Sequence, residues 1–325
     1  MNKTKTEKFT LSSVVNEYNV HIVGNGVKSF FTNTLAAAII IGIIFVIITP
    51  LISMLSKSFM TLQDRYNPLI YLIPSSVTVE NYRNAFTCLD YPKVMLTTMT
   101  YTIAMMLIQT FICAFVGYGF ARFKFPGNGF LFGLVILTIV IPVQTIMVPL
   151  YTQFRYFDVL GLFKLISGSY VNLLDTFWPM TLMSVTGVGL RSGLFIYIYR
   201  QFFKSFPKEF EEAAFIDGAG VFRTYFNIML PNASPPIITV MMLSFVWQYN
   251  DIFFASMFSN STNLLSVKLT TLASTFASML RMFDPNEVDL NVNAGLVLAI
   301  LPLIIIYIIL QKYFMQGVER SGITG

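Results

Sequence analysis

Long apolar runs, separated by shorter polar segments, dominate the pattern along this chain of 325 residues. A helix needs about 20 consecutive apolar residues to cross the hydrocarbon core of a bilayer. Six runs reach this length, and we expect each to form a transmembrane helix: Leu35 to Leu55, Val94 to Ala121, Phe130 to Tyr151, Phe177 to Tyr199, Ala233 to Phe258 and Ala294 to Phe314. The pattern therefore predicts an all-α membrane protein with six transmembrane helices.

The polar segments predict how the chain is organised around these helices. Residues 1–34 read as a polar arm, and residues 56–93 as a long loop after the first span. Residues 94–314 would form a core of five helices interrupted by a polar loop at 205–231, and residues 315–325 a tail. The sequence shows no internal repeat.

Composition agrees with the pattern, because 55% of the residues are hydrophobic, only 11% are charged and the mean hydropathy is +0.68. A soluble domain carries about 25% charged residues, so composition excludes that class. The formal charge of +5 comes from basic residues spread along the chain rather than gathered in a run, so it indicates membrane orientation rather than nucleic-acid binding.

The distribution of basic residues predicts that both termini are cytoplasmic. With six spans, twelve of the 21 Lys and Arg residues lie on the side of the termini, eight lie on the other side, and Arg191 lies within a span. The short loop from Arg122 to Gly129 holds two basic residues and no acid. Because basic loops stay in the cytoplasm, residues 56–93 would face outward.

The polar loop at 205–231 reads as two short helices around a glycine turn. Pro207 suits a first helical turn, and Glu209, Glu211 and Glu212 would lie near that helix's N-terminus, where the helix dipole favours acids. Gly218 can adopt the left-handed conformation that ends a helix. A second, amphipathic helix follows, with Pro231 at its end; its apolar positions are Phe222, Tyr225, Phe226 and Met229.

Two interpretations of this loop remain open on physical grounds. It could dock a partner protein, offering acids beside the small residues Ala213 and Ala214. Alternatively, it could lie on lipid headgroups, although such helices usually carry basic rather than acidic polar faces. The acids favour docking.

Glu212-Ala213-Ala214, Asp217-Gly218 and Leu230-Pro231 resemble the EAA loop of binding-protein-dependent ABC importer permeases. Further segments resemble the same family in the same order, and the ending is similar to its sugar branch, the relatives of the maltose permease's second subunit. These segments are Asn81-Tyr82, Tyr118 to Gly127, Ile141-Pro142, Val148 to Tyr151, Arg200 to Phe203, and Gln311 to Phe314 with Gly317. The resemblance covers residues 70 to 325.

The resemblance implies a type I ABC importer permease fold in a bacterial cell membrane, serving carbohydrate import. The residues that would dock a separate ATPase are Glu212, Ala213, Ala214, Asp217, Gly218, Leu230 and Pro231. The implied partners are an ABC ATPase dimer, which would bind ATP and Mg²⁺, a second and unlike permease, and an extracytoplasmic solute-binding protein. The implied tail contact with the ATPases involves Ser321 to Gly325.

The sequence departs from the sugar branch at three places. Tyr249 stands before Asn250-Asp251 where Trp is usual, and Trp247 lies two residues earlier. Ala255 and Ser256 occupy positions where a Pro is often seen, and residues 318–325 differ from the usual basic ending. These departures concern substrate and tail contacts.

Polar residues inside spans are candidates for the translocation pathway. A charge such as that of Arg191 costs at least about 2.5 kcal/mol in the bilayer centre, so it should face a cavity or a partner. It could belong to the translocation path or a gate, or it could form a structural salt bridge or extend its charge to the membrane interface. Asp251 could contact substrate hydroxyls or bond locally. A cluster beside it suits sugar recognition or interfacial anchoring; its members are Trp247, Gln248, Tyr249 and Asn250.

The sequence lacks the residues for chemistry of its own. Gly24 and Gly26 precede Lys28, but the spacing fails the phosphate-loop pattern. His21 is the only histidine, and Cys88 and Cys113 are too few for a metal or disulfide framework. We therefore expect no enzyme activity and no cofactor bound by this chain.

Three alternatives compete with the importer interpretation. A secondary transporter or channel would often show internal repeats and broken helices. A membrane enzyme would need catalytic signatures that the sequence lacks. A different importer branch, for polyamines or phosphonates, fits the ending less well. The acidic loop at 205–231 favours the importer interpretation, since only an importer permease needs a cytoplasmic docking helix.

Overall fold

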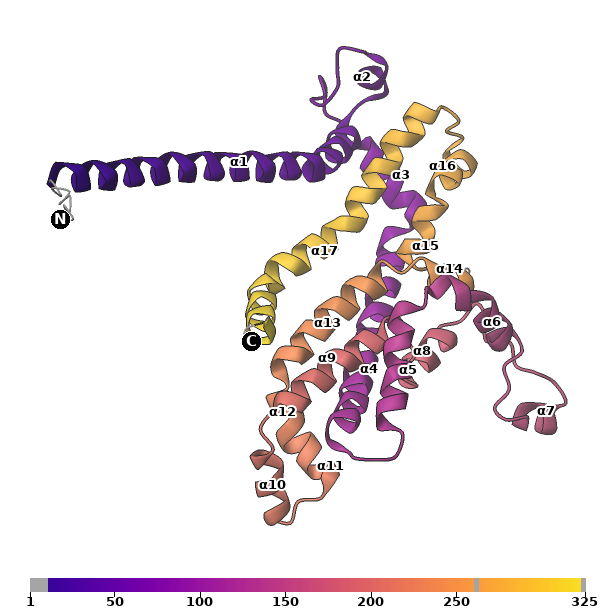
Figure 1. The fold of residues 1–325 in the computed structure, drawn as a ribbon. Coiled ribbons are helices and arrows are strands. Elements are labelled where there is room, and N and C mark those ends of the chain that lie inside the picture. The colour runs from indigo at the N-terminus through magenta and orange to yellow at the C-terminus, as the bar shows by residue number, and fades with distance from the viewer. Residues whose placement is uncertain (1–10, 260–262, 323–325) are drawn as a thin grey trace, which may run out of the picture.

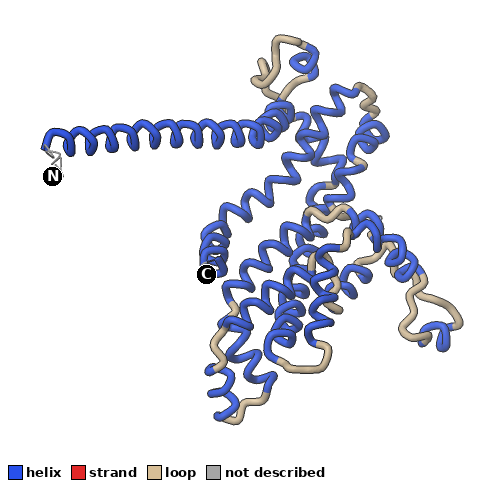
Figure 2. The backbone as a smooth tube through the Cα atoms, in the orientation of Figure 1, coloured by secondary structure: helices blue, strands red, loops and turns tan. Residues whose placement is uncertain are grey.

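The computed structural model describes residues 11–259 and 263–322. Within these ranges every regular element is helical, apart from one isolated β-bridge between Phe157 and Val171. Figures 1 and 2 show a helical bundle, from which one long helix, α1, extends alone to one side. The predicted all-α class is confirmed.

Helix α1 (Leu11–Phe59) is a single helix of 49 residues. Residue 35, where the first span was expected to begin, marks only a change from polar to apolar sequence inside this helix. Within the apolar part, Thr32–Phe59, the most apolar stretch of 18 residues has no buried residue, and only the end of the helix packs on α17. The helix continues from the expected arm into the expected first span without a break, and the division at residue 35 stays a prediction.

The bundle is built around α4 (Tyr91–Arg122), which packs against several helices that come much later in the sequence. These are α8 (Trp178–Val185), α9 (Ser192–Ser205) and α13 (Ser234–Tyr249). Aromatic side chains such as Tyr118, Phe195 and Tyr199 fill the core between them. Helix α17 (Pro285–Gly322) packs on α13 and on the end of α1.

The third expected span is bent sharply. Helices α5 (Asn128–Val140) and α6 (Val143–Arg155) meet at 104°. Pro142 causes the break, because its ring disfavours helical backbone at Ile141, which is extended with ψ 122°. The third span was predicted as one helix from Phe130 to Tyr151, and this part of the prediction is wrong.

The fourth and fifth expected spans are also interrupted. Helices α8 and α9 are separated by a turn that includes Arg191 in the left-handed conformation, with φ 59°. Helix α13 ends at Tyr249, and α14 (Phe253–Phe258) starts again beyond Asp251. Neither break was predicted, although Gly187 and Gly189 lie in the first and Asn250 and Asp251 lie in the second, because a long apolar run was read through these short segments.

The described residues include three helices that are long and apolar enough to cross a membrane, and up to five candidates if each bent pair counts as one span. The three are the apolar part of α1, α4, and Pro285–Ile309 of α17. The second bent pair joins Val221–Asn232 to α13 at 76°. The count of six spans therefore stays a prediction.

Short helices cover the two ends of the bundle (Figure 1). The α16 end consists of α2 (Leu62–Tyr66), α3 (Glu80–Leu89), α15 (Leu265–Thr270) and α16 (Leu272–Leu280) beside the start of α17. The α10 end consists of α10 (Glu209–Ile216), α11 (Val221–Thr224), the π-helix η1 (Tyr225–Met229) and α12 (Leu230–Asn232). A further short helix, α7 (Leu162–Ser167), extends from the side of the bundle beyond α6.

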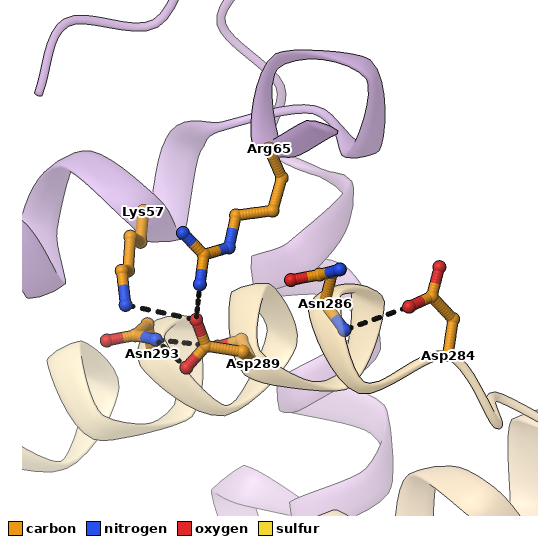
Figure 3. Close-up of polar contacts among 6 residues, drawn as sticks. All are labelled: Lys57, Arg65, Asp284, Asn286, Asp289 and Asn293. Carbon is orange, nitrogen blue, oxygen red and sulfur yellow. Dashed lines mark hydrogen bonds and ion pairs between the residues drawn. The ribbon is translucent and has the colours of Figure 1, made fainter. Parts of the chain in front are cut away.

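Figure 3 shows how the α16 end is joined to α1. The Asp289 carboxylate on α17 lies 3.0 Å from Lys57 Nζ of α1 and 3.3 Å from Arg65 Nη2 of α2. Asn293 Nδ2 donates to Asp289 Oδ1 at 3.0 Å. These side chains are about one-third exposed, so water screens the pairs.

Candidate functional site: the α10 surface and the bundle beneath it

The loop at 205–231 forms the two helices that the sequence predicts. Helix α10 ends in a Schellman turn, in which Ala219 N donates to Ala214 O at 2.9 Å and Gly218 N donates to Phe215 O at 3.0 Å. Gly218 has φ +78°, a conformation that side chains resist. The turn presents the end of α10 at the extremity of the bundle (Figure 1).

Most of the predicted docking residues form one exposed surface. Glu212, Ala213, Asp217 and Gly218 are exposed, whereas Ala214 is buried. Beside them Phe215 is 46% and Ile216 is 86% exposed. We call this set, from Glu212 to Gly218 without Ala214, the α10 surface. Acids beside uncovered apolar side chains form a surface suited to protein contact.

Leu230 and Pro231 lie apart from this surface, beyond the π-helix η1. Leu230 N donates to Tyr225 O, five residues back, which is the bond that defines the π-turn. Pro231 has no N–H to donate, and the helical path ends one residue later at Asn232. The helix thus continues one residue past Pro231, where the sequence placed its end, before the chain bends by 76° into α13.

The three glutamates of α10 have different surroundings. Glu209 and Glu212 are exposed, but Glu211 is only 7% exposed and points into the bundle. Glu211 Oε2 lies 2.9 Å from Arg122 Nε, and Glu211 Oε1 accepts a hydrogen bond from the Tyr118 hydroxyl at 2.7 Å. Arg122 also donates from Nη2 to Phe206 O at 2.6 Å. We call Tyr118, Arg122 and Glu211 the latch.

The latch joins three elements. Tyr118 and Arg122 lie one turn apart on the same face of α4, Phe206 follows the end of α9, and Glu211 belongs to α10. The ion-paired side chains of Arg122 and Glu211 are 7% and 9% exposed. A buried charge that loses its partner is strongly destabilising, so the latch fixes α10 onto α4.

The predicted pathway residues divide into two groups. Gln248, Tyr249 and Asp251 are buried and bonded within the chain. Gln248 Nε2 donates to Gln109 Oε1 at 3.1 Å, and Tyr249 donates to Ala299 O at 2.7 Å. Asp251 accepts from Phe254 N and Ala255 N at the start of α14, which is the local bonding that the sequence left open.

Arg191 and Trp247 lie together on the surface of the bundle. The Arg191 guanidinium lies 5.6 Å from the centre of the Trp247 ring, which stacks on Phe195. Arg191 is exposed, and the ion pairs found within the described residues do not involve it. Asn250 is also exposed, and its Nδ2 donates to Val246 O. Arg191 and Asn250 are thus exposed and Trp247 is half-buried, and a pathway role for them stays a prediction.

Comparison with known proteins identifies the family. Residues 110–320 match the family described as "Binding-protein-dependent transport system inner membrane component". This match covers most of the chain. It includes α9, the α10 surface, the three latch residues and α13. The chain belongs to this family. The predicted resemblance to binding-protein-dependent permeases is therefore confirmed.

Similar proteins extend the match over the whole chain. A probable ABC transporter permease, YurM of Bacillus subtilis (strain 168), is 26% identical over 99% of this chain and 98% of its own. A melibiose/raffinose/stachyose import permease, MelC of the same organism, is 28% identical over 92% and 98%. A probable starch degradation products permease, AmyC of Thermoanaerobacterium thermosulfurigenes, is 26% identical over 85% and 91%.

One solved structure supports the permease fold. A chain of a bacterial ABC transporter involved in the import of the acidic polysaccharide alginate aligns with a TM-score of 0.63. The alignment covers 95% of this chain and 100% of that chain, at 21% identity. This likeness concerns the fold alone.

Sequence reasoning missed the latch of this family member. It grouped Glu211 with Glu209 and Glu212 as acids near a helix start, and counted Arg122 only as a loop charge. One signal was available, because Tyr118 and Arg122 are four residues apart on a helix and so share a face. The pairing itself joins residues 93 positions apart, which no local pattern reveals.

Proposed function

We propose that this chain is the membrane-spanning permease subunit of an ATP-driven importer and forms half of the translocation pathway for a carbohydrate. The loop at 205–231 would couple it to a separate ATPase. The observation that carries this proposal is the α10 surface, where exposed acids flank uncovered apolar residues on a helix held rigidly by the latch. Family membership and the sugar-related names of MelC and AmyC support it.

The proposal assigns the remaining parts to partners. Two ATPase subunits would bind ATP and Mg²⁺, a second permease would complete the pathway, and an extracytoplasmic solute-binding protein would deliver substrate. The α10 end would be cytoplasmic, with both termini on that side, and the α16 end would face outward. Arg191 and Asn250 are the exposed pathway candidates, and Trp247 is half-buried beside Arg191.

The test is charge reversal on the α10 surface. We expect Glu212→Lys to insert normally but to recover little ATPase when the tagged chain is purified in gentle detergent from its native membrane, because a lysine replaces the exposed acid of the docking surface. Glu80→Lys is the matched control, since Glu80 is an exposed acid in the first turn of α3 at the opposite end.

Full recovery of an ATPase with Glu212→Lys would overturn the docking role of this surface. Recovery of an oligomer of the unaltered chain alone, with no ATPase or second permease, would instead favour a self-contained secondary transporter.

A further inference from the structure

The latch joins α10 to α4 through a buried ion pair and a hydrogen bond, in addition to apolar packing. Glu211 lies beside the docking residue Glu212 but points the opposite way, into the bundle, so α10 carries one acid on each of two functional faces. The buried acid has two separate partners on α4, Arg122 at 2.9 Å and Tyr118 at 2.7 Å. A force applied to the outer face of α10 is thereby opposed by charged and hydrogen-bonded contacts to α4, not by apolar packing alone.

Helix α4 is in turn joined closely to the rest of the bundle. A Cβ added at Gly117 would lie 2.6 Å from Tyr199 Cβ, so α4 and α9 are in near-backbone contact one residue before Tyr118. About two turns before Gly117 in α4, Gln109 Oε1 accepts hydrogen bonds from Ser244 and Gln248 of α13, at 2.7 and 3.1 Å. Close packing and such networks transmit displacement between sites.

We propose that Arg122 and Glu211 are positioning residues of the transport cycle, through which movement of α10 reaches α4. This inference rests on the proposed function, because it takes the α10 surface to be the ATPase contact. The competing route is the covalent one, from α10 through α11, η1 and α12 into α13, which needs no ion pair. If the latch transmits the movement, removing both of its charges should weaken the coupling between α10 and α4. If the covalent route transmits it, the same change should leave the coupling intact.

The decisive variant replaces both charged partners, as Arg122→Met with Glu211→Leu. Removing both charges of a buried pair avoids the destabilisation that a single deletion causes. We therefore expect the double variant to assemble and to recover as much ATPase as the unaltered chain. The measurement is MgATP hydrolysis by the purified complex in lipid vesicles, with and without the solute-binding protein recovered alongside it.

We expect stimulation of hydrolysis by the binding protein to fall about fivefold or more in the double variant, the lower range of ordinary coupling between sites. Arg122→Lys should retain part of the stimulation, because a lysine can pair with Glu211 but cannot also reach Phe206 O with a second nitrogen. Glu209→Gln, an exposed acid on the same helix, is the control and should keep full stimulation.

Unchanged stimulation in a double variant that has recovered its ATPase would overturn the inference and favour the covalent route. Loss of ATPase recovery in the double variant, with normal insertion, would also overturn it, because the latch would then only shape the docking surface. Failure of the proposed function is distinguishable, since the unaltered chain would recover no ATPase; the inference would then fall with it.

Discussion

The two ends of the bundle hold their helices in different ways. At the α10 end, Arg122 and Glu211 form an ion pair whose side chains are 7% and 9% exposed, and Tyr118 completes it. At the α16 end, Lys57 and Arg65 share the Asp289 carboxylate, with side chains 27%, 34% and 36% exposed (Figure 3). Both are ion pairs between elements far apart in the sequence, yet their surroundings differ.

The difference in exposure predicts that the contact at the α10 end is fixed and that the contact at the α16 end can shift. Buried charges must stay paired, so the α10 end should hold one geometry until both partners move together. Exposed pairs contribute little and exchange readily with water, so the α16 end can shift at small cost. Under the proposed function, the α10 end would transmit force through the buried pair, and the α16 end would meet the delivering protein with the exposed pairs.

The largest expected effect is from breaking the buried pair on one side. Arg122→Gln should lower the free energy of unfolding by about 3–5 kcal/mol, because it leaves the Glu211 carboxylate buried without a cation. Unfolding by SDS titration in mixed micelles measures it. The double replacement Arg122→Met with Glu211→Leu should recover most of this loss, and a loss as large in the double variant would contradict the pairing argument.

The next largest effect is expected from adding a methyl group at Gly117 of α4, compared with Gly295 of α17. Gly117→Ala should cost about 1–3 kcal/mol, because the new Cβ would meet Tyr199 Cβ at 2.6 Å and Arg200 N at 3.1 Å, both fixed to backbone. At the other end, Gly295→Ala would meet the end of the buried Leu272 side chain, at 2.5 Å, and no backbone atom within 4 Å. The same SDS titration should find a smaller loss for Gly295→Ala than for Gly117→Ala, because a side-chain end can shift more easily than a Cβ or a backbone nitrogen; equal losses would remove the contrast between the ends.

A smaller effect is expected from the exposed pair. Lys57→Gln should change the free energy of unfolding by no more than about 1 kcal/mol, since Arg65 still neutralises Asp289 and the pairs are screened. The effect should shrink further at high salt. A loss comparable with that of Arg122→Gln would show that exposure does not set the difference.

The smallest effect is a pH response confined to the α16 end. The pKa of Asp64 is lowered below its ordinary value of 3.8, chiefly by a hydrogen bond from the Ser75 hydroxyl. The pKa of Asp284 is lowered in the same sense, chiefly by the Tyr66 hydroxyl. Lowered pKa values stabilise the folded form above the ordinary pKa, and this stability is lost as pH falls through the folded value.

Hydrogen exchange of residues 62–78 should therefore accelerate only at strongly acidic pH, below the ordinary aspartate pKa, after correction for intrinsic rates. Asp64→Asn should flatten the response. Acceleration between neutral pH and pH 5 would mean that other groups control this segment.

The sequence predicted the parts whose signals are local. The run from Val94 to Ala121 became α4, within three residues at its start and one at its end. Gly218 formed the helix-ending turn, because a glycine after an apolar and acidic helix is a local signal. The family followed from ordered short motifs.

The parts that could not be predicted depend on tertiary context. The run from Phe177 to Tyr199 contains a turn at residues 186–191. Single glycines such as Gly187 and Gly189 are tolerated inside helices, and Arg191 adopts a left-handed conformation that arginine seldom takes, so the run alone did not locate the turn. Gln248 and Asp251 suggested a sugar site, but the structure gives them bonds inside the chain. Burial and pairing of this kind arise only when distant helices meet.

The central claim is that the α10 surface contacts an ATPase, and site-specific photo-crosslinking in the native membrane tests it most directly. A photoreactive residue at Ile216, which is 86% exposed on α10, is compared with one at Leu69, which is 90% exposed at the α16 end. We predict that position 216 captures a protein containing an ATP-binding phosphate loop and that position 69 does not. Capture of lipid alone from position 216, or of the ATPase from position 69, would contradict the account.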